Sequence, residues 1–290
     1  MPTAPINGTE IYYELHGTGF PLVFVHGGFG GLGTGQGGSI PAWVDQFSLH
    51  FQVVLYDRRS SGRSGFPESD HTMPQFAADV RELLRHLGHS RAHVWGTSAG
   101  GPITVQFGLD YPEVASSLVI AESAPWLSRD SEVLAKLKER IRILKNDGPE
   151  AAYEARREHG TVGLNLFAAT RPAESPGEEA ARKQRADAIR AQLATVPRDE
   201  RIAKYASELR TYEAYADFDA TGRFGELQMP VLIPYGTGDT VFPVAGWKQL
   251  AEGRPNVTYL PVEGAEHGQA TTPETVEAIL KFLVANTPGA

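Results

Sequence analysis

A run of small residues from Gly96 to Gly100, with the sequence Gly-Thr-Ser-Ala-Gly, constrains this chain more than any other feature. It follows the apolar run Arg91 to Trp95 and precedes a helix-like stretch, Ile103 to Asp110. A sharp turn from a strand into a helix strains the backbone and leaves room only for small side chains. The flanks therefore favour a nucleophile elbow that exposes the oxygen of Ser98. The alternative is an ordinary turn in which Ser98 caps the helix.

Short apolar runs recur along the rest of the chain, and helical or Gly-rich pieces separate them. They lie at residues 21–26, 51–57, 92–95, 117–121, 230–235 and 256–260. Runs of this kind are typical of buried, mostly parallel strands. An Asn7-Gly8 turn within residues 5–15 predicts an N-terminal β-hairpin. Apolar residues at helical spacing predict a helix over Met73 to Leu87. The sequence therefore predicts an α/β fold.

Residues 126–225 interrupt this alternation, because they are charged and rich in alanine. Four apolar residues of the segment share one helical stripe: Leu134, Leu137, Ile141 and Leu144. We expect a helical cap inserted into a core made of residues 1–125 and 226–290. The stretch Thr170 to Gly177 contains two prolines and one glycine, which predicts a mobile link inside the cap.

Charge and cysteine content narrow the function classes. The net charge is −8, and residues 126–225 carry 18 Lys+Arg against 17 Asp+Glu, which leaves 9 against 18 elsewhere. An acidic chain without a basic stripe is a poor candidate for binding nucleic acid or an anionic membrane, so small molecules are the expected partners. Cysteine is absent, which excludes disulfides, thiolate zinc sites and a cysteine nucleophile.

The same features favour a soluble protein of the cytoplasm. A chain without cysteine agrees with a reducing compartment. The sequence shows no stretch of the apolar length that spans a bilayer, and Met1 to Thr9 has neither a basic head nor an apolar region of an export signal. The histidines and carboxylates show no ligand spacing that predicts a metal site. Whether two copies of the chain form a homodimer is left open.

Residues 27–38 contain eight glycines in twelve positions. Within them, Gly28 to Gly33 matches the dinucleotide-binding pattern G-x-G-x-x-G. That motif needs its last glycine inside a helix packed on the strand, and here no helix can start before about Ala42. We therefore predict no cofactor. The N–H of Gly28 is expected to face a developing oxyanion together with the N–H of Ala99.

A serine nucleophile needs a base that removes its proton and a carboxylate that orients the base. In the order Ser, Asp/Glu, His, only His159 and His267 follow Ser98. His159 lies in a charged stretch of the cap that is typical of a solvated face, whereas His267 follows the last predicted strand. For the acid, Asp239 sits in a Gly-rich loop directly after a strand, and Glu122 is the alternative.

These segments together resemble the α/β-hydrolase superfamily, in the branch with a helical cap. The residues that carry the resemblance are His26 to Gly28, Asp57 to Ser64, Gly96 to Gly101, Gly236 to Asp239, and His267. The resemblance implies an eight-stranded, mostly parallel sheet with helices on both faces. It also implies a nucleophile at Ser98, a base at His267, an acid at Asp239, and an oxyanion hole at Gly28 and Ala99. The residues Asp57, Arg58 and His26 are expected to be structural.

The leading hypothesis is a serine hydrolase that cleaves a small carboxylic ester or lactone through an acyl-enzyme. Five aromatic residues are candidates for the lining of the substrate pocket, although buried aromatics are more often plain core: Phe29, Trp126, Phe167, Tyr212 and Tyr215. The same triad would also serve carbon–carbon bond hydrolysis or acyl transfer. A hypothesis of another class is a ligand-binding receptor on the same fold.

Overall fold

The computed structural model describes most of the chain. The described residues are 2–28, 31–32, 41–69, 71–126, 131–155, 195–239, 249–268 and 272–289, with 177, 180, 183, 184 and 187. The predicted link at residues 170–177 lies outside them apart from Gly177.

The described strands form one eight-stranded sheet in the order β1-β2-β4-β3-β5-β6-β7-β8. The strands are β1 (Thr3–Ile6), β2 (Thr9–His16), β3 (Phe20–Val25), β4 (Phe51–Tyr56), β5 (Ala92–Thr97), β6 (Ala115–Ala121), β7 (Val231–Gly236) and β8 (Val257–Val262). β1 and β2 form the predicted hairpin and pair antiparallel, as do β2 and β4. All other pairs are parallel. The predicted α/β fold with a mostly parallel sheet is confirmed.

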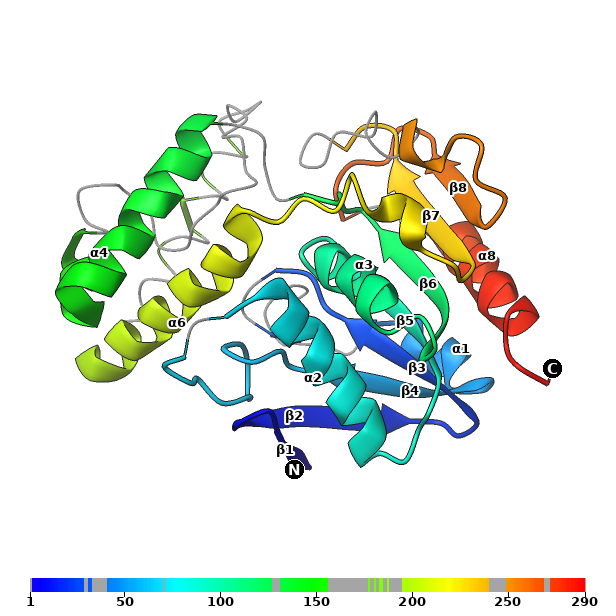
Figure 1. Ribbon diagram of the computed structural model, residues 1–290, viewed down its shortest axis with the longest axis horizontal. Coiled ribbons are helices and arrows are strands. Elements are labelled where there is room, and N and C mark those ends of the chain that lie inside the picture. Colours follow the sequence, from blue (N-terminus) through cyan, green and yellow to red (C-terminus); the bar gives the residue numbers. More distant parts are fainter. Residues whose placement is uncertain are drawn as a thin grey trace.

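Helices cover both faces of this sheet (Figure 1). The described helices are α1 (Val44–Phe47), α2 (Met73–His86), α3 (Gly100–Asp110), α4 (Ser131–Ala155), α6 (Arg198–Ala216), α8 (Pro273–Ala285) and a short 3-10 helix, η1 (Phe224–Glu226). Buried residues of α2 and α3 share one apolar cluster with β3 and β5. Those of α1 and α8 belong to a second cluster, on the opposite face of the sheet.

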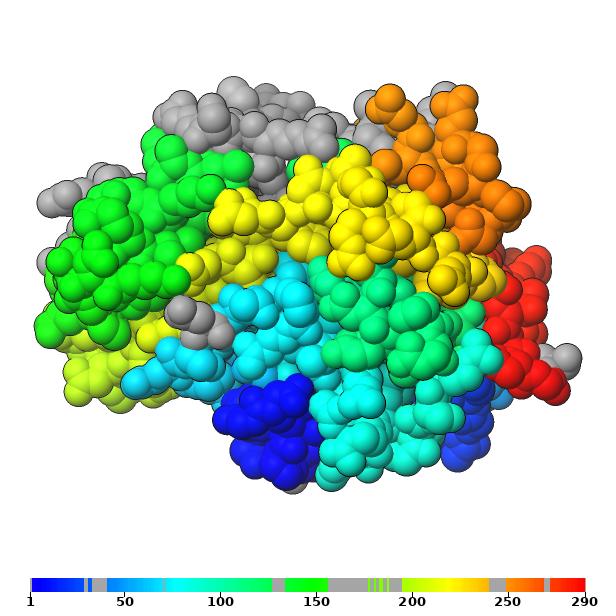
Figure 2. All heavy atoms as spheres, viewed as in Figure 1, coloured from blue at the N-terminus to red at the C-terminus, as the bar shows by residue number. Residues whose placement is uncertain are grey.

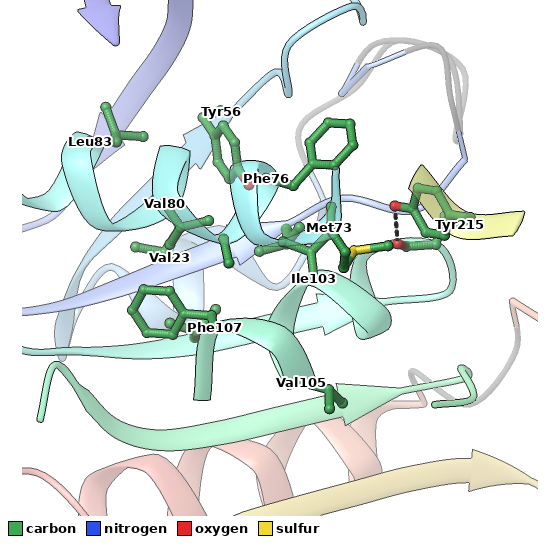
Figure 3. Packing of buried hydrophobic residues seen from close by; sticks show 14 of the residues in the cluster. Val23, Tyr56, Met73, Phe76, Val80, Leu83, Ile103, Val105, Phe107 and Tyr215 are labelled. Carbon is green, nitrogen blue, oxygen red and sulfur yellow. Dashed lines mark hydrogen bonds between the residues drawn. The ribbon is translucent and has the colours of Figure 1, made fainter. Parts of the chain in front are cut away.

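The packing of α2 shows why these segments fold as they do. The hydroxyl of Thr72 accepts a hydrogen bond from the N–H of Gln75 and caps the helix. Side chains at helical spacing then point into the first cluster, among them Phe76, Val80 and Leu83, which Figure 3 shows beside Ile103 and Phe107 of α3. Burial of each such side chain contributes about 1.5–3 kcal/mol. This layer holds the start of α3 against the sheet.

The insertion, residues 126–225, contributes the helices α4 and α6, which lie beside the sheet rather than on its faces (Figure 1). In the space-filling view α4 and α8 lie at opposite ends of the molecule (Figure 2). Leu137, Ile141 and Leu144 are buried on the predicted stripe of α4. Trp126 and Asp219 form a β-bridge, so the two ends of the insertion meet at the core. The division into a core of residues 1–125 and 226–290 and a cap of residues 126–225 stays a prediction.

The described residues contain neither a membrane-spanning helix nor a cluster of metal ligands. None of the helices described is long and apolar enough to cross a membrane. Within the same part of the chain, no cluster of three histidine, aspartate or glutamate side chains is placed to hold a metal ion.

Candidate active site

The turn between β5 and α3 has the geometry of the predicted elbow. Ser98 follows the last residue of β5 and has a φ of 49°, in the left-handed region that strains any residue other than glycine. A Cβ at Gly100 would overlap the carbonyl oxygen of Val25 in the neighbouring strand, so only glycine fits there. The N-cap of α3 is Ala99, without a side-chain hydrogen bond. The alternative in which Ser98 caps this helix is therefore wrong.

Three predicted residues meet at the carboxyl edge of the sheet. The Oγ of Ser98 lies 3.1 Å from the Nε2 of His267. The Nδ1 of the same ring lies 2.9 Å from the Oδ2 of Asp239, whose side chain is buried. The ring thus joins a serine hydroxyl to a carboxylate, as the triad chemistry requires. The rival base, His159, lies outside the described residues, and the alternative acid, Glu122, lines the nearby cavity.

The loop that carries Asp239 is hydrogen-bonded to the loop that carries His267. The N–H of Gly238 donates to the carbonyl oxygen of Ala265 at 3.0 Å. In the other direction, the N–H of Gly264 donates to the hydroxyl of Thr237 at 2.8 Å. Because the two loops follow the paired strands β7 and β8, the sheet and these bonds together set the distance between Asp239 and His267.

Backbone groups suited to an oxyanion flank the serine. Gly28 follows β3 by three residues, has a φ of 63° and lines the cavity. Ala99 follows Ser98 at the start of α3. The N–H groups of Gly28 and Ala99 find no acceptor among the residues that the structure describes. Two free amides beside a nucleophile provide the donors that a tetrahedral intermediate needs.

His26 holds the peptide before Gly28, as its predicted structural role requires. Its Nδ1 donates to the carbonyl oxygen of Gly27 at 2.8 Å, while its Nε2 accepts from the N–H of Arg58 at 3.3 Å. Burial, assisted by the Arg58 charge, lowers the pKa of His26 to about 3. The ring is therefore neutral at physiological pH and keeps this tautomer.

The turn after β4 is structural as well. The buried carboxylate of Asp57 accepts hydrogen bonds from the N–H of Leu32 at 2.6 Å and from the Nε of Arg63 at 2.9 Å. It thereby ties the Gly-rich loop to the sheet. Residues 33–40, where a dinucleotide motif would place its helix, lie outside the described residues, and the next helix described is α1, which begins at Val44.

A cavity of about 310 Å³ opens at the serine. Its described lining consists of Phe24, His26, Gly27, Gly28, Gly31, Leu32, Pro41, Trp43, Trp95, Thr97, Ser98, Glu122, His267 and Gly268. The apolar wall is aromatic: the rings of Trp43 and Trp95 lie 4.4 Å apart, and Phe24 meets both edge-on. All three belong to the core and the loop after β3, none to the insertion.

Three of the five predicted pocket residues are not among the described residues that line this cavity. Trp126 forms the bridge to Asp219, at the base of the insertion. Tyr212 and Tyr215 lie on α6 and are buried in the first apolar cluster. The pocket prediction is corrected for these three, because their rings pack as core, the alternative that the sequence left open. Phe29 and Phe167 lie outside the described residues.

Sequence reasoning missed the aromatic wall. Phe24 and Trp95 are direct neighbours in the parallel pairing of β3 and β5. Both strands end at the site, and Trp95 precedes the nucleophile by three residues, so side chains on this sheet face flank the serine. The signal was present in the sequence as an aromatic residue near the end of each strand, but it depends on which strands are neighbours.

The comparisons with known proteins agree with this architecture. Residues 21–270 match the family model described as alpha/beta hydrolase fold. The chain is 28% identical over 284 residues to RutD of Azorhizobium caulinodans, which is named for a proposed carbamate hydrolase activity, and the match covers 97% of both chains. A solved structure of a thermophilic esterase from Thermogutta terrifontis is similar, with a TM-score of 0.68, 21% identity, and coverage of 98% of this chain and 97% of that one.

An enol-lactonase from Burkholderia xenovorans is also similar in structure, with a TM-score of 0.65 and 23% identity. That match covers 98% of this chain and 99% of the lactonase chain. At these identities, the likeness to solved structures concerns the fold.

Proposed function

Because the chain belongs to the alpha/beta hydrolase fold family, we propose that it is a serine hydrolase that cleaves a small carboxylic ester or lactone. The observation that carries the proposal is the continuous contact from the Ser98 hydroxyl through the His267 ring to the buried Asp239 carboxylate. This chain of groups ends at the cavity, where a substrate carbonyl can reach the serine oxygen.

In the proposed acylation step, the Oγ of Ser98 attacks the carbonyl carbon as His267 takes the hydroxyl proton on Nε2. Asp239 accepts the Nδ1 hydrogen bond and stabilises the imidazolium that forms. The carbonyl π electrons move to oxygen, and the amides of Gly28 and Ala99 stabilise this oxyanion. When the carbonyl reforms, the bond to the alkoxide oxygen breaks and the imidazolium protonates that leaving group. In a lactone, the alcohol stays attached to the acyl chain.

In deacylation the same groups act on water. His267 takes a proton from a water molecule, whose oxygen attacks the acyl carbon of the ester to Ser98. The second tetrahedral intermediate uses the same two amides. It collapses with return of a proton to the serine oxygen, which releases the carboxylic acid and restores the enzyme.

The aromatic wall of the cavity favours a substrate that carries a flat, apolar group. Phe24, Trp43 and Trp95 pack against one another and line the same cavity as Ser98. A volume of about 310 Å³ is at the lower end of the range for small-molecule sites. The esterase and the enol-lactonase with the same fold act on bonds that this chemistry serves.

Carbamate hydrolysis is a second candidate, and the likeness to RutD along almost the whole chain favours it. Attack by Ser98 on a carbamate ester would release the alcohol and leave a carbamoyl group on the serine. Nitrogen donation makes the carbamoyl carbon less electrophilic than an ester carbonyl, so water would have to remove that group at a useful rate. A carbamate hydrolase therefore has to show fast decarbamoylation, whereas an esterase stalls at this stage.

The test compares p-nitrophenyl esters of graded acyl length with a p-nitrophenyl carbamate. Ser98→Ala and His267→Ala are each expected to lower kcat on esters by on the order of 10³-fold or more. Ser116→Ala is the matched control, since the buried Ser116 hydroxyl has no hydrogen-bond partner in the described structure, and it should keep wild-type kcat.

The outcomes separate the candidates. Continued carbamate turnover after the first p-nitrophenolate release identifies a carbamate hydrolase, whereas a single burst followed by arrest identifies an esterase. Ester turnover that survives Ser98→Ala would refute both.

A further inference from the structure

Two buried side chains connect the residues whose amides face the proposed oxyanion. Arg58 follows β4 by two residues, and Tyr215 is near the end of α6 in the insertion. They are 2% and 0% exposed. The Nη1 of Arg58 donates to the hydroxyl oxygen of Tyr215 at 2.7 Å. Neither side chain lines the cavity in the part of the chain described, so neither is placed to touch a substrate.

Each member of this pair also holds one residue of the oxyanion hole. The Nη2 of Arg58 donates to the carbonyl oxygen of Gly28. The hydroxyl of Tyr215 donates to the carbonyl oxygen of Ala99 at 2.6 Å, a bond drawn as a dashed line in Figure 3. An unbroken path therefore runs from the Gly28 carbonyl through the guanidinium and the phenol to the Ala99 carbonyl.

Gly28 depends on such a bond more than Ala99 does. A Cβ at Gly28 would meet nothing within 4 Å, and its φ is 63°, so packing does not fix its backbone. The His26 ring holds the peptide on its N-terminal side through the Gly27 carbonyl, and Arg58 holds the peptide on its C-terminal side. Ala99 is held between the elbow and the first turn of α3. A bridge between the two carbonyl groups restrains the backbone of Gly28 relative to that of Ala99, and through it the separation of their N–H groups.

We propose that Arg58 and Tyr215 are positioning residues that align the amides of Gly28 and Ala99 for the oxyanion, and that helix α6 thereby takes part in catalysis. The inference rests on the serine hydrolase function proposed above. Preorganised donors stabilise a transition state only at the correct distance, and small misplacements cost much of the rate.

The chemistry of the two groups suits this role. Burial raises the pKa of Tyr215, so its phenol stays protonated and can donate to Ala99. Since His26 is neutral, the positive charge next to Gly28 comes from the Arg58 guanidinium. A fixed cation behind the Gly28 peptide also favours negative charge on the reacting oxygen.

Ser207 provides a matched control, because it joins α6 to the core without contacting Gly28 or Ala99. The hydroxyl of Ser207, also on α6, donates to the hydroxyl of Ser60 at 2.5 Å, and Ser60 lies 2.6 Å from the Nε2 of His71. This contact joins the same helix to the core but reaches neither Gly28 nor Ala99. Ser207→Ala and Tyr215→Phe each remove one buried hydroxyl between α6 and the core.

The experiment measures kcat, KM and the affinity of an aryl trifluoromethyl ketone, which adds to the serine and places an oxyanion in the hole. Tyr215→Phe should lower kcat about 10-fold, leave KM within about 2-fold, and weaken the ketone by the same factor as kcat. Ser207→Ala should leave all three values near those of wild type. Arg58→Lys, which keeps the charge but cannot reach both partners, should behave as Tyr215→Phe does.

The outcomes can be told apart. Labelling by a fluorophosphonate counts active serines in each preparation, so misfolded protein is excluded from the rates. If wild type is not labelled, the proposed function fails and the positioning role fails with it. If wild type is labelled but Tyr215→Phe matches Ser207→Ala, or loses kcat without losing ketone affinity, only the positioning role is overturned.

Discussion

The nucleophile elbow and the helix pair of the insertion are held in place by different means. At the elbow, the close packing of backbone atoms determines the geometry, as at Gly100 against the carbonyl of Val25. In the insertion, α4 and α6 pack through an apolar stripe and are joined at the surface by ion pairs such as Lys145 with Glu213. The first arrangement tolerates almost no change in side chain, whereas the second rests on contacts that other residues could supply.

The difference shows which part of the molecule positions the residues of the candidate active site. The core holds Ser98, His267 and Asp239 within one hydrogen-bonded chain at the edge of the sheet. The insertion reaches that edge through a few buried polar contacts, of which the Tyr215 bond to Ala99 is one. Buried hydrogen bonds of this kind are worth more than exposed ion pairs, because the low dielectric strengthens them and an unpaired partner is costly.

The largest expected difference is in the free energy of unfolding, between loss of a buried ion pair in the core and loss of an exposed ion pair in the insertion. In the core, the guanidinium of Arg59 binds the carboxylate of Asp79 at 2.6 Å, and both side chains are at most 2% exposed. Asp79→Asn removes the anion and leaves a buried cation, which should lower the free energy of unfolding by about 3–5 kcal/mol. In the insertion, Glu150→Gln removes an exposed partner of Arg198 and should change nothing measurable in the same urea titration.

Equal losses of unfolding free energy in Asp79→Asn and Glu150→Gln would contradict the contrast between the core and the insertion. Because neither Asp79 nor Arg59 is among the described residues that line the cavity, the active fraction of folded Asp79→Asn should still turn over esters at the wild-type kcat. A kcat loss in the folded variant would place this ion pair in the reaction machinery.

A smaller difference in stability is expected between alanine substitutions at two glycines. Gly100→Ala would press a methyl group into the Val25 carbonyl at the elbow, which should cost about 2–3 kcal/mol of stability and reduce kcat. Gly222, near the end of the insertion, has open space around it, so Gly222→Ala should leave stability unchanged or raise it by up to about 0.5 kcal/mol. Thermal unfolding measures the stability of each variant, and ester turnover measures its kcat. If Gly100→Ala changed neither stability nor kcat, the backbone of the elbow would be able to move and accommodate the methyl group.

The elbow could be predicted from the sequence because its requirements are local. Small residues at fixed spacing follow a strand, and the same reasoning placed Asp239 and His267 in loops at the ends of strands. The hairpin followed from an Asn-Gly turn in the same way. Each of these signals lies within a few residues of the element it predicts, so no knowledge of the tertiary structure was needed.

The cavity wall and the link from α6 could not be predicted in this way. Tyr215 meets groups 116 and 157 positions away, Ala99 and Arg58, so nothing near it in the sequence distinguishes a hydroxyl that holds the elbow from one that faces a substrate. The aromatic wall depends on β3 lying beside β5, an order that is set by the whole sheet. Short-range patterns determine elements, whereas long-range pairing determines what lines a pocket.

The smallest predicted effect depends on pH and tests whether burial in the insertion resembles burial in the core. Burial raises the pKa of Glu208, on α6, to about 7, although the hydroxyl of Tyr212 and the charge of Arg140 oppose the shift. Its carboxyl is therefore protonated in the folded chain over a pH range in which the unfolded chain has already lost the proton. Stability from this group is complete below pH 4.5, the ordinary pKa of a glutamate, and is lost as pH rises toward 7.

Glu208→Gln should remove that loss, because a glutamine stays neutral at every pH. Relative to wild type, the variant should be more stable by about 1–2 kcal/mol at pH 8, with the difference shrinking toward zero as the pH falls to 4.5. Urea titrations at several pH values measure the difference, and Glu200→Gln on the exposed first turn of α6 should give a flat line. A flat line for Glu208→Gln as well would mean that water reaches the carboxylate, and that the insertion does not bury charge as the core does at Asp79.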